Sequence, residues 1–583
     1  MSISSFSSTQ RTSWRFVRFA FGLLLSLPLL SSLGEFGSQA LGEDAVSSSV
    51  AVTSGPVVKP NAKPAGIRNV IIMIGDGMGP QQVGLLTQYA KYAKGSTVPD
   101  RKAAIETVMS AGTVAIVNNQ PHGALVVDSA AAATQLATGE LAGSEMIGAN
   151  YRGERVENIV EAAHRVGKSA GLVTDTRITH ATPAGFAAHQ ANRESENEIA
   201  LDYLDNKVEV LMGGGIRNWV PEAINDRNSP TYAALMQMTG GAYPATSRRR
   251  DNRNLLLEAR GEYQLAFDRE ALAKVTDGKL IGIFADSELN DALEDAATAA
   301  NPQRTEPTHV EMVGKALELL DKNPKGFFLM IEGGQIDWAG HNNDAGVLLH
   351  ELLDFDAAVR LVYEWAKHRD DTLLIVTADH ETGSFGFSYA GRPLPETSKL
   401  EGDLFADVPF EPNFNYAPPE LLDQLHAQKK SYFTIMSEFD ALPPKEQTAE
   451  RLVEIVNDAS AFKITLDDAV HVLTRERNKN YVPGHPYMNT ETVPKIDDFE
   501  PFYVYGENLR MNLLGRAMAA QQHVTWGAGT HSSTPVILGA FGPDHAAKRF
   551  GGMLHATDVG KRMIELITAE APATASVKAA AAR

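Results

Sequence analysis

Short apolar runs recur along the chain, and each is followed by a polar or glycine-rich break and usually by a helical pattern. The runs cover residues 70–74, 124–127, 169–173, 208–212, 280–284, 327–331, 372–376 and 536–538. Their apolar residues are continuous rather than alternating, as strands buried on both faces of a parallel sheet require. The pattern predicts an α/β fold with a doubly wound, mostly parallel sheet flanked by helices. Ligands are expected at the carboxyl ends of its strands.

Helical patterns alternate with these runs. They cover residues 80–93, 156–166, 308–320, 347–367 and 558–568. From about residue 390 to 521 the texture changes, because Pro-rich, aromatic and acidic segments surround two helix-like stretches at 448–457 and 466–474. We therefore expect one α/β domain from residues 67–389 and 522–570. Residues 390–521 are interpreted as a large insertion or cap near the face that carries the site.

Residues 1–40 have the layout of a signal peptide. Three arginines precede an apolar run at residues 19–30, and Ser38-Gln39-Ala40 offers small residues for cleavage. The run is too short to span a bilayer comfortably. We expect cleavage, export to the periplasm or the extracellular space, and no membrane span afterwards; an uncleaved anchor is the alternative. Residues 41–66 are expected to be a linker, and residues 571–583 a disordered Ala-rich tail.

The chain of 583 residues carries a formal net charge of −19 and contains no cysteine. Removal of residues 1–40 takes away three arginines and Glu35, which leaves about −21 for the mature chain. That charge argues against a general nucleic-acid binder or a binder of anionic membranes. The lack of cysteine excludes disulfides, cysteine-based zinc sites and thiol nucleophiles. Because the chain is acidic overall, any site that binds phosphate must create positive charge locally.

Candidate ligands gather at the ends of the predicted strands. They are Asp76, Asp128, Ser129, Glu332, Asp337, His341, Asp379 and His380. Each alone has a plain structural explanation, such as an Asx turn, a surface charge or a helix start. Their shared position at one edge of a sheet instead predicts a single site. Carboxylates with imidazoles suit zinc, and carboxylates with hydroxyls suit magnesium, so a serine among them indicates metal-assisted transfer chemistry.

Ser129 stands in the stretch 125–139, which we interpret as a short buried strand, an acidic break and an alanine-rich helix. A serine at a helix start lies where free backbone N–H groups gather, and such a position favours an anion. The alternative is that Ser129 is only the N-cap of this helix. The candidate ligands at the other strand ends favour a serine that is both the cap and a nucleophile.

With these residues placed, the chain resembles the metal-dependent alkaline phosphatases. Six blocks carry the resemblance in the family's order: residues 74–79 (IGDGMG), 126–134 (VVDSAAAAT), 180–184 (HATPA), 332–337 (EGGQID) with His341, 377–383 (TADHETG) and 529–531 (GTH). One block can match by chance, whereas six in order are specific. The resemblance implies that residues 67–389 and 522–570 form the catalytic domain.

The resemblance also implies a role for each matching residue. Ser129 would be the nucleophile that becomes phosphorylated, and Arg193 would grip two phosphate oxygens. The implied ligand sets are Asp337, His341 and His531 for one zinc, Asp76, Asp379 and His380 for a second zinc, and Asp76, Thr182 and Glu332 for a third ion, usually magnesium. These roles are chemically consistent, because a serine hydroxyl needs a cation or base to become a good nucleophile, and a guanidinium fork matches two phosphate oxygens.

Four positions qualify the resemblance. His180 stands where some bacterial members carry an aspartate, so the third site is expected to hold magnesium less tightly or to accept another ion. Trp338 either lines the phosphate pocket or only packs. Arg177 is a rival to Arg193 as the phosphate-gripping arginine. Asp128 is expected to support the site without binding an ion itself.

The leading hypothesis is an exported alkaline phosphatase that hydrolyses small-molecule phosphate monoesters to alcohol and inorganic phosphate through a phosphoserine, with two zinc ions and one magnesium ion. One alternative is a phosphodiesterase of the same superfamily, which typically has a threonine nucleophile and lacks the third ion. A different alternative is a non-catalytic protein that binds metal or phosphate. Homodimers are common in the family, so a homodimer is one expected assembly.

Overall fold

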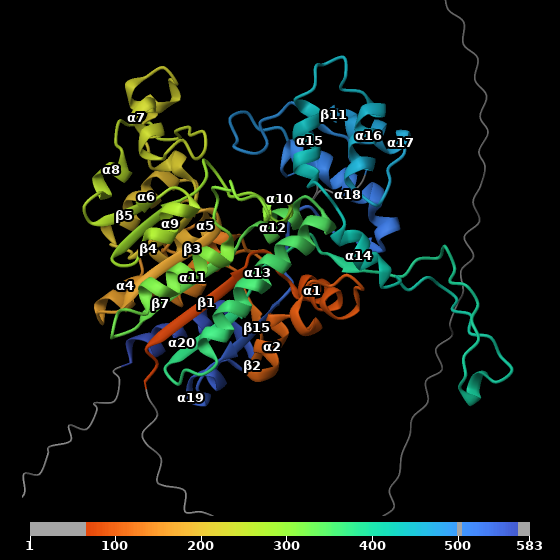
Figure 1. The fold of residues 1–583 in the computed structure, drawn as a ribbon, viewed down its shortest axis with the longest axis horizontal. Coiled ribbons are helices and arrows are strands. Elements are labelled where there is room, and N and C mark those ends of the chain that lie inside the picture. Colours follow the sequence, from red (N-terminus) through yellow and green to blue (C-terminus); the bar gives the residue numbers. More distant parts are fainter. Residues whose placement is uncertain (1–65, 498–503, 570–583) are drawn as a thin grey trace, which may run out of the picture. The chain divides into compact units, whose positions relative to one another are not determined.

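The structure, a computed structural model, describes residues 66–497 and 504–569 (Figure 1). The chain divides into two units, Met1–Asn61 and Ala62–Arg583, and every described residue belongs to the second. The expected signal peptide at 1–40, the linker up to residue 65 and the tail at 571–583 lie outside the described residues. Those assignments remain predictions.

Ten strands of the described residues form one sheet in the order β16-β2-β15-β8-β1-β7-β3-β4-β6-β5. Neighbouring strands are parallel, except that β15 runs antiparallel to β2 and β8. The strands are β1 (Asn69–Gly75), β2 (Thr113–Asn118), β3 (Ser169–Arg177), β4 (Val210–Gly214), β5 (Tyr263–Ala266), β6 (Lys279–Ile283), β7 (Phe327–Gly333), β8 (Thr372–Thr377), β15 (Val536–Phe541) and β16 (Gly552–His555). The expected α/β fold with a mostly parallel sheet is confirmed.

Helices flank this sheet in two groups. In Figure 1, α11 (His309–Leu320) and α13 (Ala345–Ala366) lie in front of the strands. They pack against each other, and α1 (Pro80–Tyr92) and α2 (Ala104–Ala111) pack against α13. The second group is α3 (Ser129–Thr138), α4 (Ile159–Arg165), α5 (Ala181–Ala187) and α20 (Ala556–Thr568), whose members pack with one another and against the sheet.

The central strands explain why one edge of the sheet collects polar groups. Every residue of β1, β7 and β8 is buried, as expected for apolar strands covered on both faces. Ile74 of β1 pairs with Glu332 of β7 and with Thr377 of β8. Because the three strands end at the same level, Asp76 and Asp379 follow them to the same place and meet Glu332 there.

The predicted strand at residues 124–127 is wrong. These residues form no strand, and the exposed fractions of Leu125 and Val126 are 78% and 44%. The strand in this part of the chain is instead β2, a few residues earlier. Burial alternates along β2, and its Val114 and Ile116 are exposed. Val126 lines the cavity that contains Ser129, whereas Val127 is buried in a small apolar cluster, so this run is not a buried strand.

Residues 390–521 contain more helix than the sequence pattern predicts. The two expected stretches correspond to α16 (Ala449–Ala459) and α17 (Leu466–Leu473), and α15 (Tyr432–Asp440) and α18 (Leu509–Gln522) pack with them. Figure 1 shows these four helices together in blue and cyan, while α14 (Glu420–His426) packs against α13 and α1. A small antiparallel pair, β11 (Arg475–Arg477) and β12 (Thr492–Pro494), completes the described segment.

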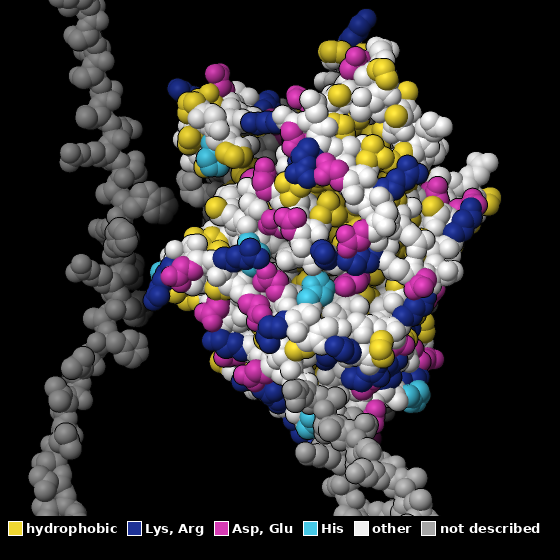
Figure 2. Space-filling view, turned by 90° about the vertical axis from the view of Figure 1, so that its left-hand side faces the viewer, with side chains coloured by type: hydrophobic (Ala, Val, Ile, Leu, Met, Phe, Trp, Pro, Cys, Tyr) yellow, Lys and Arg dark blue, Asp and Glu magenta, His cyan; other side chains and the backbone are white. Residues whose placement is uncertain are grey.

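Shorter elements complete the described chain. They are α6 (Glu196–Asp205), α7 (Pro230–Met238), α8 (Leu255–Ala259), α9 (Arg269–Lys274), α10 (Ala292–Thr298), α12 (Gln335–His341), α19 (Asp544–Ala547), β9 (Glu381–Thr382), β10 (Gly386–Phe387), β13 (Val524–Thr525) and β14 (His531–Ser532). Across residues 66–497 and 504–569, no helix combines the length and apolarity needed to cross a bilayer. On the face shown in Figure 2, acidic and basic side chains are interspersed, so the net negative charge is not gathered into one patch there.

Candidate active site

Two histidines from distant parts of the chain point their ring nitrogens at each other. His341 ends α12, and His531 begins β14, which pairs with β9 directly after β8. Their Nε2 atoms are 3.1 Å apart, and their Nδ1 atoms each lie 2.8 Å from a backbone carbonyl, of Gly529 and Val127 respectively. A carbonyl only accepts, so each Nδ1 donates and each Nε2 presents a lone pair. Two facing lone pairs repel each other, and a bound cation or a proton between them removes that repulsion.

Asp337 completes this group on α12. Its carboxylate oxygens lie 3.2 Å from His341 Nε2 and 3.5 Å from His531 Nε2. Ligands of a tetrahedral zinc with bond lengths of about 2.0–2.1 Å are about 3.3–3.4 Å from one another, so these separations suit one ion. The structure thus brings together the three residues that the family resemblance grouped as ligands of one zinc.

A second group surrounds His380, one residue after Asp379 at the end of β8. His380 Nε2 lies 3.3 Å from Asp76 Oδ1, 3.3 Å from Asp379 Oδ2 and 3.1 Å from Ser129 Oγ. One ring nitrogen cannot make three such hydrogen bonds at once, whereas four groups around an ion would lie at these separations. By separation alone, Asp337 also falls in this group with Asp76 and His380.

A third group lies behind Asp76. Asp76, His180 and Glu332 each offer one ligand atom within 4.8 Å of the others. Thr182 Oγ1 lies 3.4 Å from Asp76 Oδ2, so the threonine that the sequence placed here is also present. Asp76 Oδ1, Glu332 Oε1 and Asp379 Oδ2 are buried without a hydrogen-bond partner among the described residues. Buried polar atoms are normally satisfied, and a bound cation would satisfy these.

The electrostatics of these buried groups also favour a bound cation. Burial and then the neighbouring carboxylates hold the pKa of Asp76 well above its usual range. Burial, with a second carboxylate beside each group, raises the pKa of Asp379 to about 7 and that of Glu332 to about 8. Burial lowers the pKa of His531 to about 4, which keeps that ring neutral. Against the effect of burial, Asp337 in contrast raises the pKa of His341. Crowded carboxylates beside imidazoles form a donor set that divalent cations complete.

Ser129 is the first residue of α3 rather than its cap. The N-cap is Asp128, whose Oδ2 accepts from the backbone N–H of Ala130, so the expectation that Ser129 itself caps the helix is corrected. An aspartate ranks with serine as an N-cap, and its position leaves the hydroxyl of Ser129 free to face His380. The Ser129 side chain therefore lies both beside the ligand groups and at the positive end of a helix.

Arg193 approaches the same place from the loop before α6. One of its terminal nitrogens lies 3.4 Å from Asp128 Oδ2, and the other lies 3.2 Å from His180 Nε2. Arg177 is positioned differently, because its Nε donates to both carboxylate oxygens of Glu196 at 3.0 Å. Both arginines line the cavity, but Arg193 is the one held against the Ser129 loop.

A cavity of about 830 Å³ opens in front of Ser129. Trp338 lines it and also packs edge-on against the His180 ring, with 5.9 Å between ring centroids, so this side chain meets both sequence-based alternatives. Asp128, for its part, bonds Arg193 and the backbone N–H of Glu145 and belongs to no ligand group among the described residues.

Part of this cavity wall was not predicted from the sequence. Residues of the segment 390–521 also line it, among them Phe433, His485, Tyr487, Met488, Tyr505 and Met511. The Tyr505 ring meets the His341 ring edge-on at 4.8 Å between centroids, and Tyr487 packs on Tyr505 at 5.7 Å. The only sequence signal was the aromatic content of the segment, because no motif or period marks these positions.

Comparisons with known proteins agree with this geometry. The family model described as alkaline phosphatase matches residues 67–441. Alkaline phosphatase 4 of Bacillus subtilis is 35% identical over 335 residues, which are 56% of this chain and 64% of that protein. Alkaline phosphatase 3 of Bacillus subtilis is 33% identical over 533 residues, which are 89% of this chain and 94% of that protein. The chain thus spans slightly less than two thirds of the first relative and nearly all of the second.

Solved structures share the fold. An alkaline phosphatase from Thermus thermophilus aligns with a TM-score of 0.66 at 23% identity, covering 87% of this chain and 94% of that one. A cold-active alkaline phosphatase from Shewanella sp. aligns with a TM-score of 0.59 at 23% identity, covering 86% and 99%. Because a family model matches more than half of the chain and a relative matches along nearly its whole length, this chain belongs to the alkaline phosphatase family of phosphate-monoester hydrolases.

Proposed function

We propose that this protein hydrolyses small-molecule phosphate monoesters to an alcohol and inorganic phosphate through a phosphoserine at Ser129. The observation that carries the proposal is the position of Ser129 Oγ, 3.1 Å from the His380 nitrogen that also faces Asp76 and Asp379. A serine beside an imidazole that also faces two carboxylates is placed for activation by a cation. A protein that only bound metal or phosphate would not need it there.

We further propose two zinc ions and one magnesium ion. The zinc ligands would be Asp337, His341 and His531 for one ion and Asp76, Asp379 and His380 for the other; Asp76, Thr182 and Glu332 would hold magnesium. The first two sets contain imidazoles, which zinc prefers, and the third contains carboxylates and a hydroxyl, which magnesium prefers. His180, which lies within ligand distance of the third set, is the residue expected to weaken its preference for magnesium.

The reaction divides into two displacements. When bound, the ions supply positive charge that favours the serine alkoxide and the departing oxygen. In the first displacement, Ser129 Oγ bonds to phosphorus, the ester P–O bond breaks, and the alcohol leaves with a proton. In the second, water adds to phosphorus, the bond to Ser129 Oγ breaks, and phosphate leaves as the serine regains its proton. Arg193 and the N-terminus of α3 hold the non-bridging oxygens throughout.

Substrate preference tests the proposal against the diesterase alternative. We expect kcat/KM for p-nitrophenyl phosphate to exceed that for bis(p-nitrophenyl) phosphate by about 10³-fold or more, because a diester lacks one of the charged oxygens that the site would grip. Steady-state rates on the metal-loaded protein measure this ratio. A ratio below one would favour the diesterase, and no turnover of either ester would favour a binding protein.

Arg193 should matter through its grip on phosphate. Replacement by alanine is expected to lower kcat/KM for p-nitrophenyl phosphate by about 10- to 100-fold, because charge-assisted hydrogen bonds to the phosphoryl oxygens are lost. Arg193→Lys should recover part of the loss. Arg227, which is exposed and has no bonded partner among the described residues, gives the matched control Arg227→Ala. Normal turnover in Arg193→Ala together with a large loss in Arg177→Ala would transfer this role to Arg177.

A further inference from the structure

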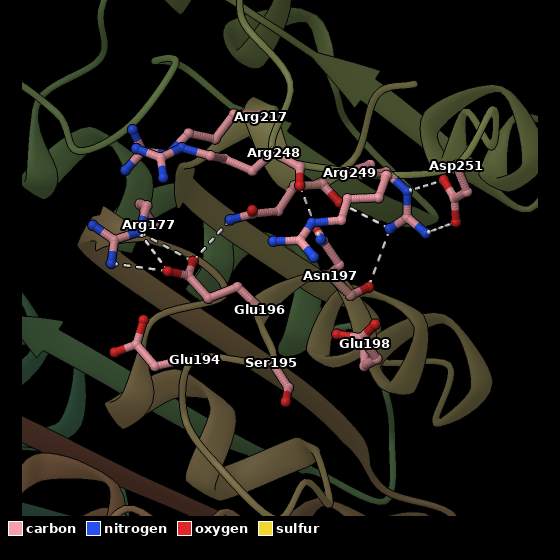
Figure 3. A pocket seen from close by; sticks show the side chains of 12 residues that line it. Arg177, Glu194, Ser195, Glu196, Asn197, Glu198, Arg217, Arg248, Arg249 and Asp251 are labelled. Carbon is pink, nitrogen blue, oxygen red and sulfur yellow. Dashed lines mark hydrogen bonds and ion pairs between the residues drawn. The ribbon is translucent and has the colours of Figure 1, made fainter. Parts of the chain in front are cut away.

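A second cavity, of about 650 Å³, adjoins the one that contains Ser129. Arg177 and Glu194 line both cavities, so the two share a wall. Figure 3 shows arginines around the second cavity: Arg177, Arg217 and the adjacent Arg248 and Arg249 reach it from three parts of the chain. Arg250 lines it as well. Four carboxylates line this cavity beside the five arginines, so the pairing of these charges decides whether positive charge is left over.

Only two of the five arginines are neutralised by a bonded carboxylate. Arg177 donates from Nε to Glu196 at 3.0 Å, and Arg249 donates to Asp251 at 2.8 and 2.7 Å. Figure 3 draws both interactions. Among the described residues, the guanidinium groups of Arg217, Arg248 and Arg250 have no hydrogen bond or ion pair.

The nearby acidic side chains do not pair with these three guanidinium groups. Glu194 accepts a hydrogen bond from the Tyr487 hydroxyl at 2.8 Å, which holds it toward the first cavity. Glu288 lies 3.7 Å from Arg177 and is not bonded to Arg217. The remaining lining carboxylate, Glu198, is exposed and has no bonded cation among the described residues.

The positive charge of Arg217 is destabilised by its surroundings. Burial and then the charge of Arg177 lower the pKa of Arg217, with a smaller effect from Arg248, and the opposing effect of Glu288 and Glu196 does not cancel them. A partly buried guanidinium beside two others is unfavourable unless an anion joins them. The forked guanidinium group of arginine matches the oxygens of phosphate, which is also the anion proposed to bind in the cavity that contains Ser129.

We propose that the second cavity binds a second phosphate group of the substrate, so that the preferred substrates are bisphosphorylated monoesters. The inference rests on the proposed function, because the first phosphate would sit at Ser129. Because Arg177 and Glu194 line both cavities, the proposal places the two phosphate groups of one molecule on either side of these side chains. Arg217 and Arg248 supply the unpaired charge that the distal phosphate would neutralise.

The test compares a hexose bisphosphate with the matching hexose monophosphate on the metal-loaded enzyme. We expect KM for the bisphosphate to be about 10-fold lower in the wild type. The double variant Arg217→Gln/Arg248→Gln should remove that advantage and leave KM and kcat for the monophosphate unchanged. The control Arg227→Gln/Arg392→Gln makes the same charge change at two exposed arginines and should keep the advantage. An unchanged KM ratio in the double variant would overturn the proposal.

Binding separates this inference from the proposed reaction. Calorimetric titration of the two sugar phosphates into metal-loaded Ser129→Ala measures the ratio of their dissociation constants. We expect the bisphosphate to bind about 10-fold more tightly, which is the same factor as in the KM values. If the wild type hydrolysed neither sugar phosphate while Ser129→Ala kept the affinity ratio, only the proposed reaction would be contradicted. Titration with inorganic phosphate addresses the other source of the same anion. A second binding event that the double variant loses, without a change in the sugar-phosphate ratio, would assign the cavity to free phosphate and overturn the substrate assignment.

Discussion

Replacing Ser129 with alanine is expected to lower kcat for p-nitrophenyl phosphate by about 10³-fold or more, because the phosphoserine route then lacks its nucleophile. The variant should keep its metal content, since Ser129 Oγ is one contact of His380 and the carboxylates of Asp76 and Asp379 remain. Residual activity is expected from water attack in a site that still orients phosphate. Rapid-quench trapping of labelled phosphate should find a covalent adduct in the wild type and none in the variant.

Ser144 offers the matched control for this substitution. It lines the same cavity but belongs to none of the three ligand groups. Ser144→Ala should therefore keep turnover within about twofold of the wild type, because substitutions of exposed residues that bind neither ligand nor ion usually have small effects. Near-normal turnover in Ser129→Ala, with zinc content verified, would remove Ser129 from the mechanism. Loss of activity together with loss of zinc would instead point to a structural role.

There is a physical reason why the sequence predicted some strands correctly and others not. β1, β7 and β8 are buried on both faces, so their sequences are continuous apolar runs that are easily recognised. β2 pairs near one end of the sheet and exposes alternate residues, which weakens its signal. The run at 124–127 is apolar for other reasons, because Val126 lines an open cavity and Val127 is buried in a small cluster without forming a strand. Hydrophobicity alone does not distinguish a core from a cavity wall.

The site shows a similar limit. Asp76, Glu332 and Asp379 were predictable from the strand ends, because parallel strands in register deliver their following residues to one edge. His531 was not, since it reaches His341 from 190 residues further along the chain through the β14–β9 pair, and only the family resemblance pointed to it. Tyr487 and Tyr505 come from a segment without a motif, and their place on the cavity wall depends wholly on tertiary packing.

Removal of the metal ions should abolish activity and also loosen the fold. We expect a chelated, dialysed sample to lose at least about 10³-fold in kcat, because Ser129 then loses the charge that activates it. The melting temperature should fall on the order of 10 °C, because ions that bind only the folded state stabilise it by several kcal/mol. Zinc with magnesium should restore both properties, as followed by turnover and by differential scanning calorimetry.

The loss of stability follows from the carboxylates that the ions would neutralise. Without cations, Asp76, Glu332 and Asp379 remain buried together with unsatisfied oxygens, and their raised pKa values record that cost. The variant His341→Gln should lose zinc at one site, whereas His350→Gln, which changes another buried histidine that bonds only the His426 carbonyl, should keep it. Full activity and an unchanged melting temperature in a sample verified as metal-free would refute the metal assignment. An intact fold without activity would limit the ions to chemistry alone.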